Sequence, residues 1–257
     1  MKFIVSANTD IGIARPTNQD SLSLKVLDTK QGYMVFVILC DGMGGLAKGE
    51  LASTDVILAF EDWVRSKLPI LSENDMDDII FEQWKEIVVA ENLKFNEYSM
   101  SHGEKLGTTA VAMLITQKYC YIMNVGDSRA YEINMNGIRQ ITHDHTFGNR
   151  ELLAGRMTRQ QVENDSRKNK LTECIGGSSI NVKPDFFKIK VQRDSIYLLC
   201  SDGFVHKITS EEMHSMFNPE NIRDKEKLNQ VCIDAIELNK SRHEKDNITV
   251  AVIRTGD

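Results

Sequence analysis

The chain has 257 residues, of which 41% are hydrophobic and 26% are charged, and its formal net charge is −6. This length and apolar fraction are enough for one substantial core, so we expect a single domain over residues 1–257. The negative net charge argues against a nucleic-acid partner, because binding to phosphates needs a basic stripe.

Several features of the sequence predict a soluble, cytoplasmic protein with no membrane partner. The longest unbroken apolar stretch, Met34 to Cys40, is far shorter than the roughly 20 residues that a membrane span needs. The apolar run at the N-terminus is too short for a signal sequence. The five cysteines are scattered without a Cys-x-x-Cys pair, and this odd number indicates a reducing compartment.

Nine segments have the short, apolar and β-branched pattern of strands. They are residues 3–7, 21–27, 34–40, 109–115, 119–125, 128–133, 186–191, 195–200 and 247–253. Turn-forming pairs join some of them, for example Asn136-Gly137 after the sixth segment. Many consecutive strands at short spacing favour antiparallel sheets over alternating strand–helix–strand units.

Three longer segments, residues 50–67, 77–98 and about 224–239, have apolar residues on one helical face. Residues 158–161 and 209–212 fit capping boxes that begin short helices. We therefore predict an α+β fold, with a central antiparallel β-sandwich of two sheets flanked by pairs of helices.

The segment of residues 143–177 differs from the rest of the chain. It is polar, rich in Arg, Asn and Gly, and contains one short helix signal. Within a compact domain such a stretch is typical of a functional loop.

Aspartates at strand ends are the candidate chemical groups. Asp41 and Asp202 each follow an apolar run and precede a glycine, and Asp127 follows a third such run. Asp20 and Asp246 also stand next to predicted strands. Each alone is a weak signal, because Asp-Gly is a common turn pair. Together, however, buried carboxylates would repel one another unless they were protonated or bound to cations.

Oxygen ligands of this kind suit Mg²⁺ or Mn²⁺ better than zinc. Gly42 would let the backbone approach an ion and offer its carbonyl group. His143 and His145 suggest a transition-metal site, but no further His or Cys follows at ligand spacing, so surface roles are favoured. The other histidines, including His206, are isolated in the sequence, which predicts structural or solvated side chains.

Seven short motifs together carry a family resemblance. They are Arg15…Asn18-Gln19-Asp20, Asp41-Gly42-Met43-Gly44-Gly45, Gly107-Thr108-Thr109, Gly126-Asp127-Ser128-Arg129, Asp144-His145, Ser201-Asp202-Gly203 and Asp246-Asn247. Their order and spacing resemble the metal-dependent serine/threonine phosphatases of type 2C, and most of all the compact bacterial members that act in signalling. The resemblance covers about residues 6–253. It implies a β-sandwich flanked by helix pairs, with a two-metal cleft at one end and a flap at 143–177.

The resemblance also implies roles for individual residues. Asp41 would bridge two metal ions, and the backbone carbonyl of Gly42 would bind the second ion. Asp202 and Asp246 would hold the first ion. Asp20 would bind a metal directly or through its waters.

Two further residues complete the implied site. Asp127 matches the position that helps to bind a weaker third metal in bacterial members, and Arg15 would bind the substrate phosphate as a bidentate guanidinium. The implied reaction is hydrolysis of phosphoserine and phosphothreonine by a water or hydroxide that bridges two Mn²⁺ or Mg²⁺ ions. The implied partners are phosphoproteins, namely a cognate serine/threonine kinase and its targets, and we expect a monomer.

Some residues depart from the family pattern. Gln19 stands where many relatives have Glu, and Met43 stands where many eukaryotic relatives have a histidine proposed as general acid. The flap has Asn164-Asp165-Ser166 in place of His-Pro, so Asp165 or Ser166 either assists a third metal or is an ordinary polar loop residue. Two alternatives stay open: a catalytically silent module that binds a phosphorylated partner, and a regulatory phosphatase specific for one partner.

Overall fold

Two five-stranded antiparallel sheets lie face to face at the centre of this computed structural model, which describes residues 1–43, 48–71, 76–177 and 181–256. The strands of the first sheet are, in spatial order, β1 (Lys2–Asp10), β12 (Ile248–Gly256), β11 (Ile196–Cys200), β7 (Arg129–Asn134) and β8 (Gly137–Gln140). Those of the second are β10 (Asp185–Lys190), β6 (Tyr119–Val125), β5 (Ala110–Ile115), β3 (Gly32–Asp41) and β2 (Asp20–Thr29). A separate short pair consists of β4 (Gly107–Thr108) and β9 (Ile175–Gly176).

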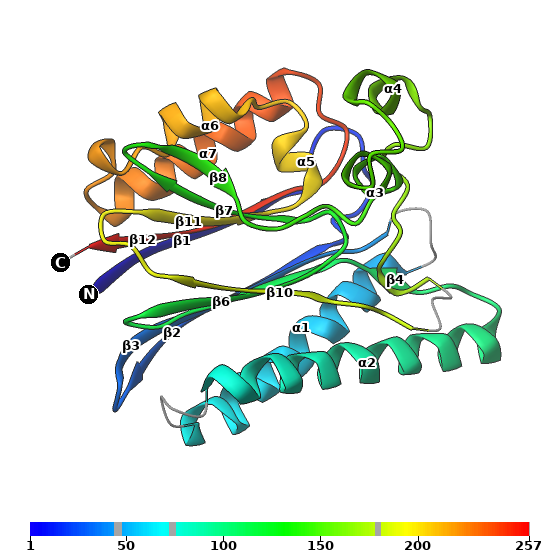
Figure 1. Ribbon diagram of the computed structural model, residues 1–257, viewed down its shortest axis with the longest axis horizontal. Helices are drawn as coiled ribbons and strands as arrows, with labels where there is room; N and C mark the ends of the chain where they lie inside the picture. The colour runs from blue at the N-terminus through cyan, green and yellow to red at the C-terminus, as the bar shows by residue number, and fades with distance from the viewer. Residues whose placement is uncertain (44–47, 72–75, 178–180, 257) are drawn as a thin grey trace.

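Helices cover the outer face of each sheet, so the layers run helix, sheet, sheet, helix (Figure 1). The long helices are α1 (Gly49–Ser66), α2 (Met76–His102) and α7 (Lys225–Ser241). The shorter ones are α3 (Phe147–Leu153), α4 (Arg159–Asn164), α5 (Asp202–Val205), α6 (Ser210–Met216) and the 3₁₀ turns η1 (Leu68–Ile70) and η2 (Pro219–Asn221). Helices α1 and α2 cover the sheet that contains β3, and α6 and α7 cover the other (Figure 1). The predicted α+β sandwich is confirmed.

Strand β3 is buried on both faces, which explains why its sequence lacks polar alternation. Val37 and Leu39 pack into the core between the two sheets, while Phe36 and Ile38 pack into the core beneath α1 and α2. All four side chains have no exposed surface. This strand therefore holds the two apolar layers of its half of the molecule together.

An aromatic cluster joins the helix pair to β3. Trp63 of α1 and Trp84 of α2 meet edge to face, with ring centroids 5.6 Å apart, and Phe36 of β3 contacts both rings. The indole N–H of Trp63 donates to the Gln83 side chain at 2.6 Å. Both tryptophans thus have the packing role that their helical spacing predicts.

All nine predicted strands and the three long helices are present, and both predicted capping boxes form. The predicted hairpin is also present, although its two-residue loop is Met135-Asn136 and Gly137 already pairs with Asn134. The sequence patterns did not predict β4, β8, β9 or α3, all of which are too short for a clear period. The loop of residues 143–177 therefore has two short helices rather than one.

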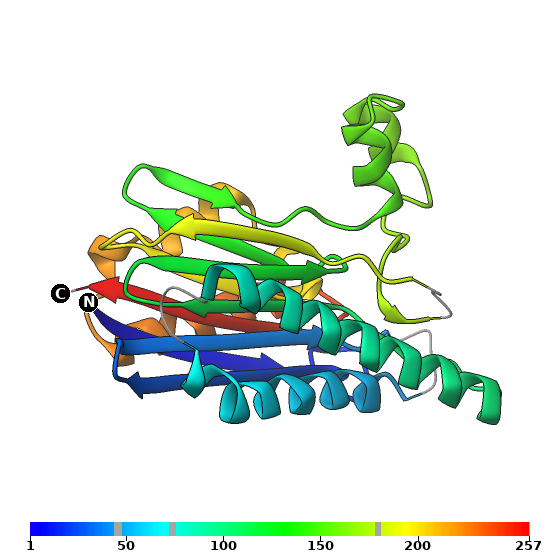
Figure 2. The same ribbon diagram turned by 60° about the horizontal axis from the view of Figure 1, so that its bottom comes forward.

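The two ends of the chain lie side by side, at the end of the sandwich opposite α3 and α4 (Figures 1 and 2). Strand β1 pairs with β12 along its whole length, from Lys2 opposite Gly256 to Asp10 opposite Ile248. In Figure 2, α3 and α4 stand out from the body of the sandwich. In the described part of the chain, no helix is long and apolar enough to cross a lipid bilayer.

Replacing Trp84 by Ala should lower the free energy of unfolding by about 3–5 kcal/mol, because it leaves a cavity among aromatic rings. Met100, which is 88% exposed on the same helix, supplies the control, and Met100→Ala should stay within about 0.5 kcal/mol of the wild type. Urea unfolding followed by circular dichroism measures both. Equal unfolding midpoints for the two variants would contradict the packing role of Trp84.

Candidate metal centre

The ends of four strands meet at one edge of the sandwich. Asp41 ends β3 and lies directly opposite Asp20, the first residue of β2. Asp202 comes just after β11, and Asp246 comes just before β12, which pairs with β11 in antiparallel register. Because antiparallel neighbours begin and end at the same edge, these four carboxylates are delivered to one end of the molecule.

A cavity of about 170 Å³ opens at this edge. It is lined by Arg15, Asp41, Gly42, Met43, Thr109, Asp127, Asn169, Leu171, Asp202 and Asp246. The structure thus brings together every predicted site residue except Asp20, whose side chain is not part of the lining and is only 8% exposed. Gly44 and Gly45 lie outside the described residues.

The backbone of Asp41 is held by the Gly-Thr-Thr motif. The Asp41 amide donates to the hydroxyl of Thr109 at 3.0 Å. The carbonyl of Asp41 accepts from the hydroxyl of Thr108 and from the backbone N–H of Thr109, both at 2.9 Å. The motif therefore positions a predicted metal ligand without itself offering one.

Gly42 has no room for a side chain. An added Cβ would lie 2.4 Å from the carbonyl oxygen of Gly49 and 2.7 Å from that of Gln19. The Gly42 amide also donates to the Gln19 carbonyl at 3.1 Å. Only glycine allows the chain to turn this tightly beneath the cavity.

The Asp144-His145 motif secures the turn that carries Asp127. Asp144 accepts charge-assisted hydrogen bonds from two nitrogens of Arg129: from Nε at 2.9 and 3.1 Å and from Nη2 at 2.6 Å. His145 forms hydrogen bonds with the Gly126 backbone through both its own amide and its ring Nδ1. The other ring nitrogen of His145 lies 3.1 Å from a carboxylate oxygen of Asp185. These contacts give His145 a structural role, whereas the sequence favoured a surface role.

The turn that carries Asp246 is tied to the first loop of the chain by Asn247. Its side-chain amide donates to the carbonyls of Ile11 and Thr17, and its side-chain oxygen accepts from the Gln19 amide at 2.9 Å. This arrangement places Arg15 beside the cavity. The guanidinium of Arg15 donates to Asp246 at 2.6 Å, which raises the pKa of Arg15.

Burial and mutual repulsion disfavour the ionised form of the aspartates. Burial raises the pKa of Asp20 to about 7 and that of Asp127 to about 8, and neighbouring aspartates add to both shifts. The pKa values of Asp41 and Asp202 are also raised, again mainly by burial. A bound cation would remove this cost, because it stabilises the charged carboxylates.

Buried oxygens without partners test whether a divalent metal fits. Within the described ranges, both carboxylate oxygens of Asp20 and Oδ1 of Asp202 are buried and accept no hydrogen bond of good geometry, although the hydroxyls of Ser201 and Thr249 lie close to Asp20. Groups of this kind are normally satisfied in folded proteins, so these oxygens are free to accept a bound cation or its waters. The donor set, carboxylate oxygens with a nearby backbone carbonyl, suits Mg²⁺ or Mn²⁺.

The site is not a closed cage of side chains. Among the described residues, no three His, Cys, Asp or Glu groups are close enough together to enclose an ion. One of the carboxylates, that of Asp246, pairs with Arg15 instead. Such an open arrangement leaves coordination positions for water, as Mg²⁺ in particular requires.

Of the residues that depart from the family pattern, some line the cavity and others do not. The Gln19 amide donates to Glu50 at 3.3 Å and is not part of the cavity lining, whereas Met43 lines the cavity. Asp165 pairs with Arg167, which lowers the pKa of Asp165 to about 2. Neither Asp165 nor Ser166 lines the cavity, so the structure favours ordinary loop roles for them.

Sequence reasoning missed three residues near the site. Asn169 and Leu171 line the cavity from the loop of residues 143–177, and only their place in the flap hinted at this. His206, which is isolated in the sequence and predicted to be structural or solvated, has contacts next to the site. Its ring lies between Asp202 and Glu244, with nitrogen–oxygen distances of 3.4 Å to each.

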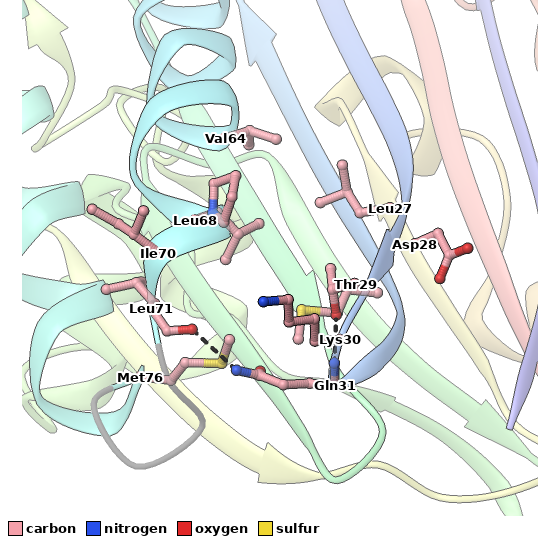
Figure 3. Close-up of a pocket in the computed structure, with 12 residues that line it drawn as sticks. Leu27, Asp28, Thr29, Lys30, Gln31, Val64, Leu68, Ile70, Leu71 and Met76 are labelled. Atoms are coloured by element: carbon pink, nitrogen blue, oxygen red, sulfur yellow. Dashed lines mark hydrogen bonds between the residues drawn. The ribbon is translucent and has the colours of Figure 1, made fainter.

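A larger cavity of about 490 Å³ lies elsewhere, between the β2–β3 hairpin and η1 (Figure 3). Apolar side chains such as Leu27, Leu68 and Met76 point toward it, whereas the Asp28 carboxylate points away (Figure 3). Strand β2 separates this cavity from Asp20 by roughly 30 Å, at about 3.3 Å per residue. It belongs to the opposite end of the sheet from the aspartates and contains none of the predicted site residues.

Comparison with known proteins decides the family. Residues 15–234 match the family model described as "Protein phosphatase 2C". The serine/threonine phosphatase stp of Listeria monocytogenes serotype 4b is 31% identical over 248 residues, which are 95% of this chain and 93% of that protein. The chain belongs to the type 2C protein phosphatases. It is similar in the same way to the protein phosphatase PhpP of Streptococcus pneumoniae, at 29% identity over 97% of this chain and 96% of the relative.

Solved structures of type 2C phosphatases agree. The serine/threonine phosphatase of S. agalactiae matches with a TM-score of 0.85 and 27% identity over 99% of this chain and all of that one. The catalytic domain of PstP, solved in complex with two manganese ions, matches with a TM-score of 0.76 and 26% identity over 99% of both chains. The protein is therefore a serine/threonine phosphoprotein phosphatase of a metal-dependent family.

The metal-free protein should lose stability as the pH rises from about 4 to about 7. An aspartate in an unfolded chain titrates near pH ~3.9, whereas the folded pKa of Asp20 is about 7. Between these values the folded state binds a proton that the unfolded state has released, so alkalinity favours unfolding. At pH 8, Asp20→Asn should raise the free energy of unfolding of the metal-free protein by roughly 1–4 kcal/mol.

Urea unfolding in EDTA at pH 4 and pH 8 measures this effect. The exposed Asp62 on α1 supplies the control, because Asp62→Asn should change stability little at either pH. A difference between Asp20→Asn and wild type that is the same at both pH values would contradict a raised pKa for Asp20.

Proposed function

We propose that residues 1–257 act as one catalytic domain that hydrolyses phosphoserine and phosphothreonine in proteins, using residues at the edge of the sandwich. The observation that carries this proposal is the single cavity that Arg15, Asp41, Asp127, Asp202 and Asp246 line together. Membership of the type 2C family supports the reaction class. The charge pattern supports the proposal as well, since the cluster of buried acidic residues suits cations and the single arginine suits a phosphate.

Five residues would hold two Mn²⁺ or Mg²⁺ ions. Asp41 would contact both ions, with the Gly42 carbonyl on one side and Asp202 and Asp246 on the other, while Asp20 would contribute directly or through water. When bound, the ions supply a water acidic enough to attack phosphorus near neutral pH and offset charge on the phosphoryl oxygens. The two manganese ions of the PstP catalytic domain support this proposal.

Asp127 would help to hold a weaker third ion. It lines the same cavity as Asp41, and burial raises its pKa to about 8, so it too favours a nearby cation. The flap residues Asp165 and Ser166 are not proposed as ligands, since they lie outside the cavity lining.

Arg15 would bind the phosphate of the substrate. Its side chain is 36% exposed at the cavity, and one of its terminal nitrogens donates to Asp246. A guanidinium has five N–H donors in a planar fork, so the remaining donors could bind two phosphate oxygens. This contact would hold the phosphate in place and oppose its growing charge during attack.

The proposed reaction uses no protein nucleophile. Burial raises the pKa of Cys40, Cys120 and Cys200, and that of Cys174 to about 11, so these thiols stay protonated and unreactive. The described residues that line the cavity include no histidine or cysteine. The leaving oxygen of the substrate would therefore take its proton from water.

We further propose a cytoplasmic monomer whose substrates are a serine/threonine kinase and the targets of that kinase. The support is general: the relatives are bacterial serine/threonine phosphatases, and such enzymes act on phosphoproteins. Copurification and phosphoproteomics in cells that lack the chain would identify the actual substrates.

Asp202→Asn should lower kcat for para-nitrophenyl phosphate with Mn²⁺ by about 100-fold or more, because it removes a charged ligand from a preorganised site. EDTA should abolish the activity of the wild type. The control Asp62→Asn, at an exposed position on α1, should retain full activity. Activity that persists in EDTA would overturn the metal mechanism, and a wild type inactive with every divalent metal would favour a phosphoprotein-binding module instead.

Arg15→Ala should lower kcat/KM for a phosphothreonine peptide by roughly 10- to 100-fold, since charge-assisted contacts to the phosphate are lost. Arg15→Lys should recover only part of this loss, because an ammonium cannot make the planar bidentate contact. Arg65→Ala is the matched control, as the Arg65 side chain is 81% exposed on α1. If Arg15→Ala and Arg65→Ala have equal kcat/KM values, Arg15 does not bind the phosphate.

A further inference from the structure

His206 and Glu244 lie between the two turns that carry Asp202 and Asp246. The Nε2 atom of His206 is 3.4 Å from Oδ2 of Asp202, and its Nδ1 atom is 3.4 Å from Oε2 of Glu244. His206 caps the C-terminus of α5, where its backbone N–H donates to the carbonyl of Asp202 at 3.1 Å. One short helical turn thus brings the imidazole back over the side chain of Asp202.

Glu244 is the buried member of this arrangement. It is only 5% exposed, and its Oε1 atom accepts hydrogen bonds from the backbone N–H groups of Lys245 and Asp246, at 2.8 and 3.0 Å. Its other oxygen, Oε2, faces His206. One carboxylate therefore fixes the backbone that leads into Asp246 and at the same time contacts the residue beside Asp202.

The backbone around Glu244 is also fixed. His243 has a φ of +61°, a left-handed conformation that residues other than glycine seldom adopt. A residue keeps such a strained backbone conformation only when the surrounding structure holds it in place. Here the N–H of Glu244 donates to the carbonyl of the buried Asn239, which ties the turn to the end of α7.

The two oxygens of Asp202 have different surroundings. Oδ2 faces His206, whereas Oδ1 is buried and has no hydrogen-bond partner among the described residues. Each ring nitrogen of His206 thus faces one carboxylate, that of Asp202 or that of Glu244. A carboxylate held through one oxygen keeps a defined orientation and leaves the other oxygen for a cation.

We propose that His206 and Glu244 are positioning residues for the divalent-cation position that Asp202 and Asp246 share. His206 orients the carboxylate of Asp202, and Glu244 holds both His206 and the backbone of Asp246. This inference rests on the proposed function, because it assumes that these aspartates bind the cation. Partners that orient metal ligands typically change metal affinity by about 10- to 100-fold.

The test is Mn²⁺ binding at one fixed pH, measured by isothermal titration calorimetry and by the electron paramagnetic resonance signal of free Mn²⁺. In His206→Ala, the Kd of the affected Mn²⁺ position should rise by about 10- to 100-fold. In the same variant, kcat at saturating Mn²⁺ should stay within about threefold of wild type, and KM for para-nitrophenyl phosphate should be unchanged. His206→Gln keeps an amide donor and should recover part of the affinity.

Glu244→Gln separates the two contacts of Glu244. The amide oxygen can still accept from the N–H groups of Lys245 and Asp246, so the turn should fold, but the charge that faces His206 is lost. Its Mn²⁺ affinity should fall, and the double variant with His206→Ala should bind no more weakly than the weaker single variant, because the two residues act together. Thermal unfolding in EDTA checks that each variant is folded.

His214→Ala is the matched control, since His214 lies on α6 and contacts the carbonyl of Asn134, away from the cavity. Its Kd for Mn²⁺ should equal that of the wild type. A folded His206→Ala variant whose Kd is within twofold of wild type would overturn the positioning role. Asp202→Asn in the same titration tests the assumption separately, because failure of the proposed site would leave its Mn²⁺ binding unchanged as well.

Discussion

The burial of several neighbouring carboxylates is the main physical constraint at one end of this molecule. Asp20, Asp41, Asp127 and Asp202 lie where water is scarce, and burial together with neighbouring negative charge raises the pKa of each. Left to relax, such groups would move into solvent or take up protons. The surrounding structure prevents these carboxylates from moving into solvent. A bound divalent cation would prevent their protonation, and this couples the stability of the fold to metal binding.

The backbone at this edge is held by strand pairing and by polar side chains that are not themselves candidate ligands. The β2–β3 ladder places Asp20 opposite Asp41, and the hydroxyls of Thr108 and Thr109 fix the Asp41 backbone. Asn247 performs the same task for the turn of Asp246. The apolar layers between and outside the sheets make these ladders rigid. The apolar core therefore supplies most of the stability of the fold, and the candidate site residues lie at the ends of the strands.

Membership of the type 2C family accounts for the reaction class but leaves particular residues to be explained. The Gln19 amide points to Glu50 on α1 instead of the cavity, so no extra carboxylate enters the site at this position. Met43 adds an apolar side chain to the lining and offers no proton. Around Asp202 and Asp246, His206 and Glu244 add a further set of contacts.

The sequence by itself determined the strands, the long helices and the position of each candidate aspartate. Those features depend on local periodicity and on neighbours in the chain, as the apolar run that ends at Asp41 illustrates. Elements as short as α3 and β8 carry no clear period, so tertiary contacts decided them. The contact of His206 with Glu244 joins the end of α5 to the turn after α7, and only packing of α5 against α7 and β12 brings them together. Local propensity places a residue on an element, but long-range packing decides which distant residue it meets.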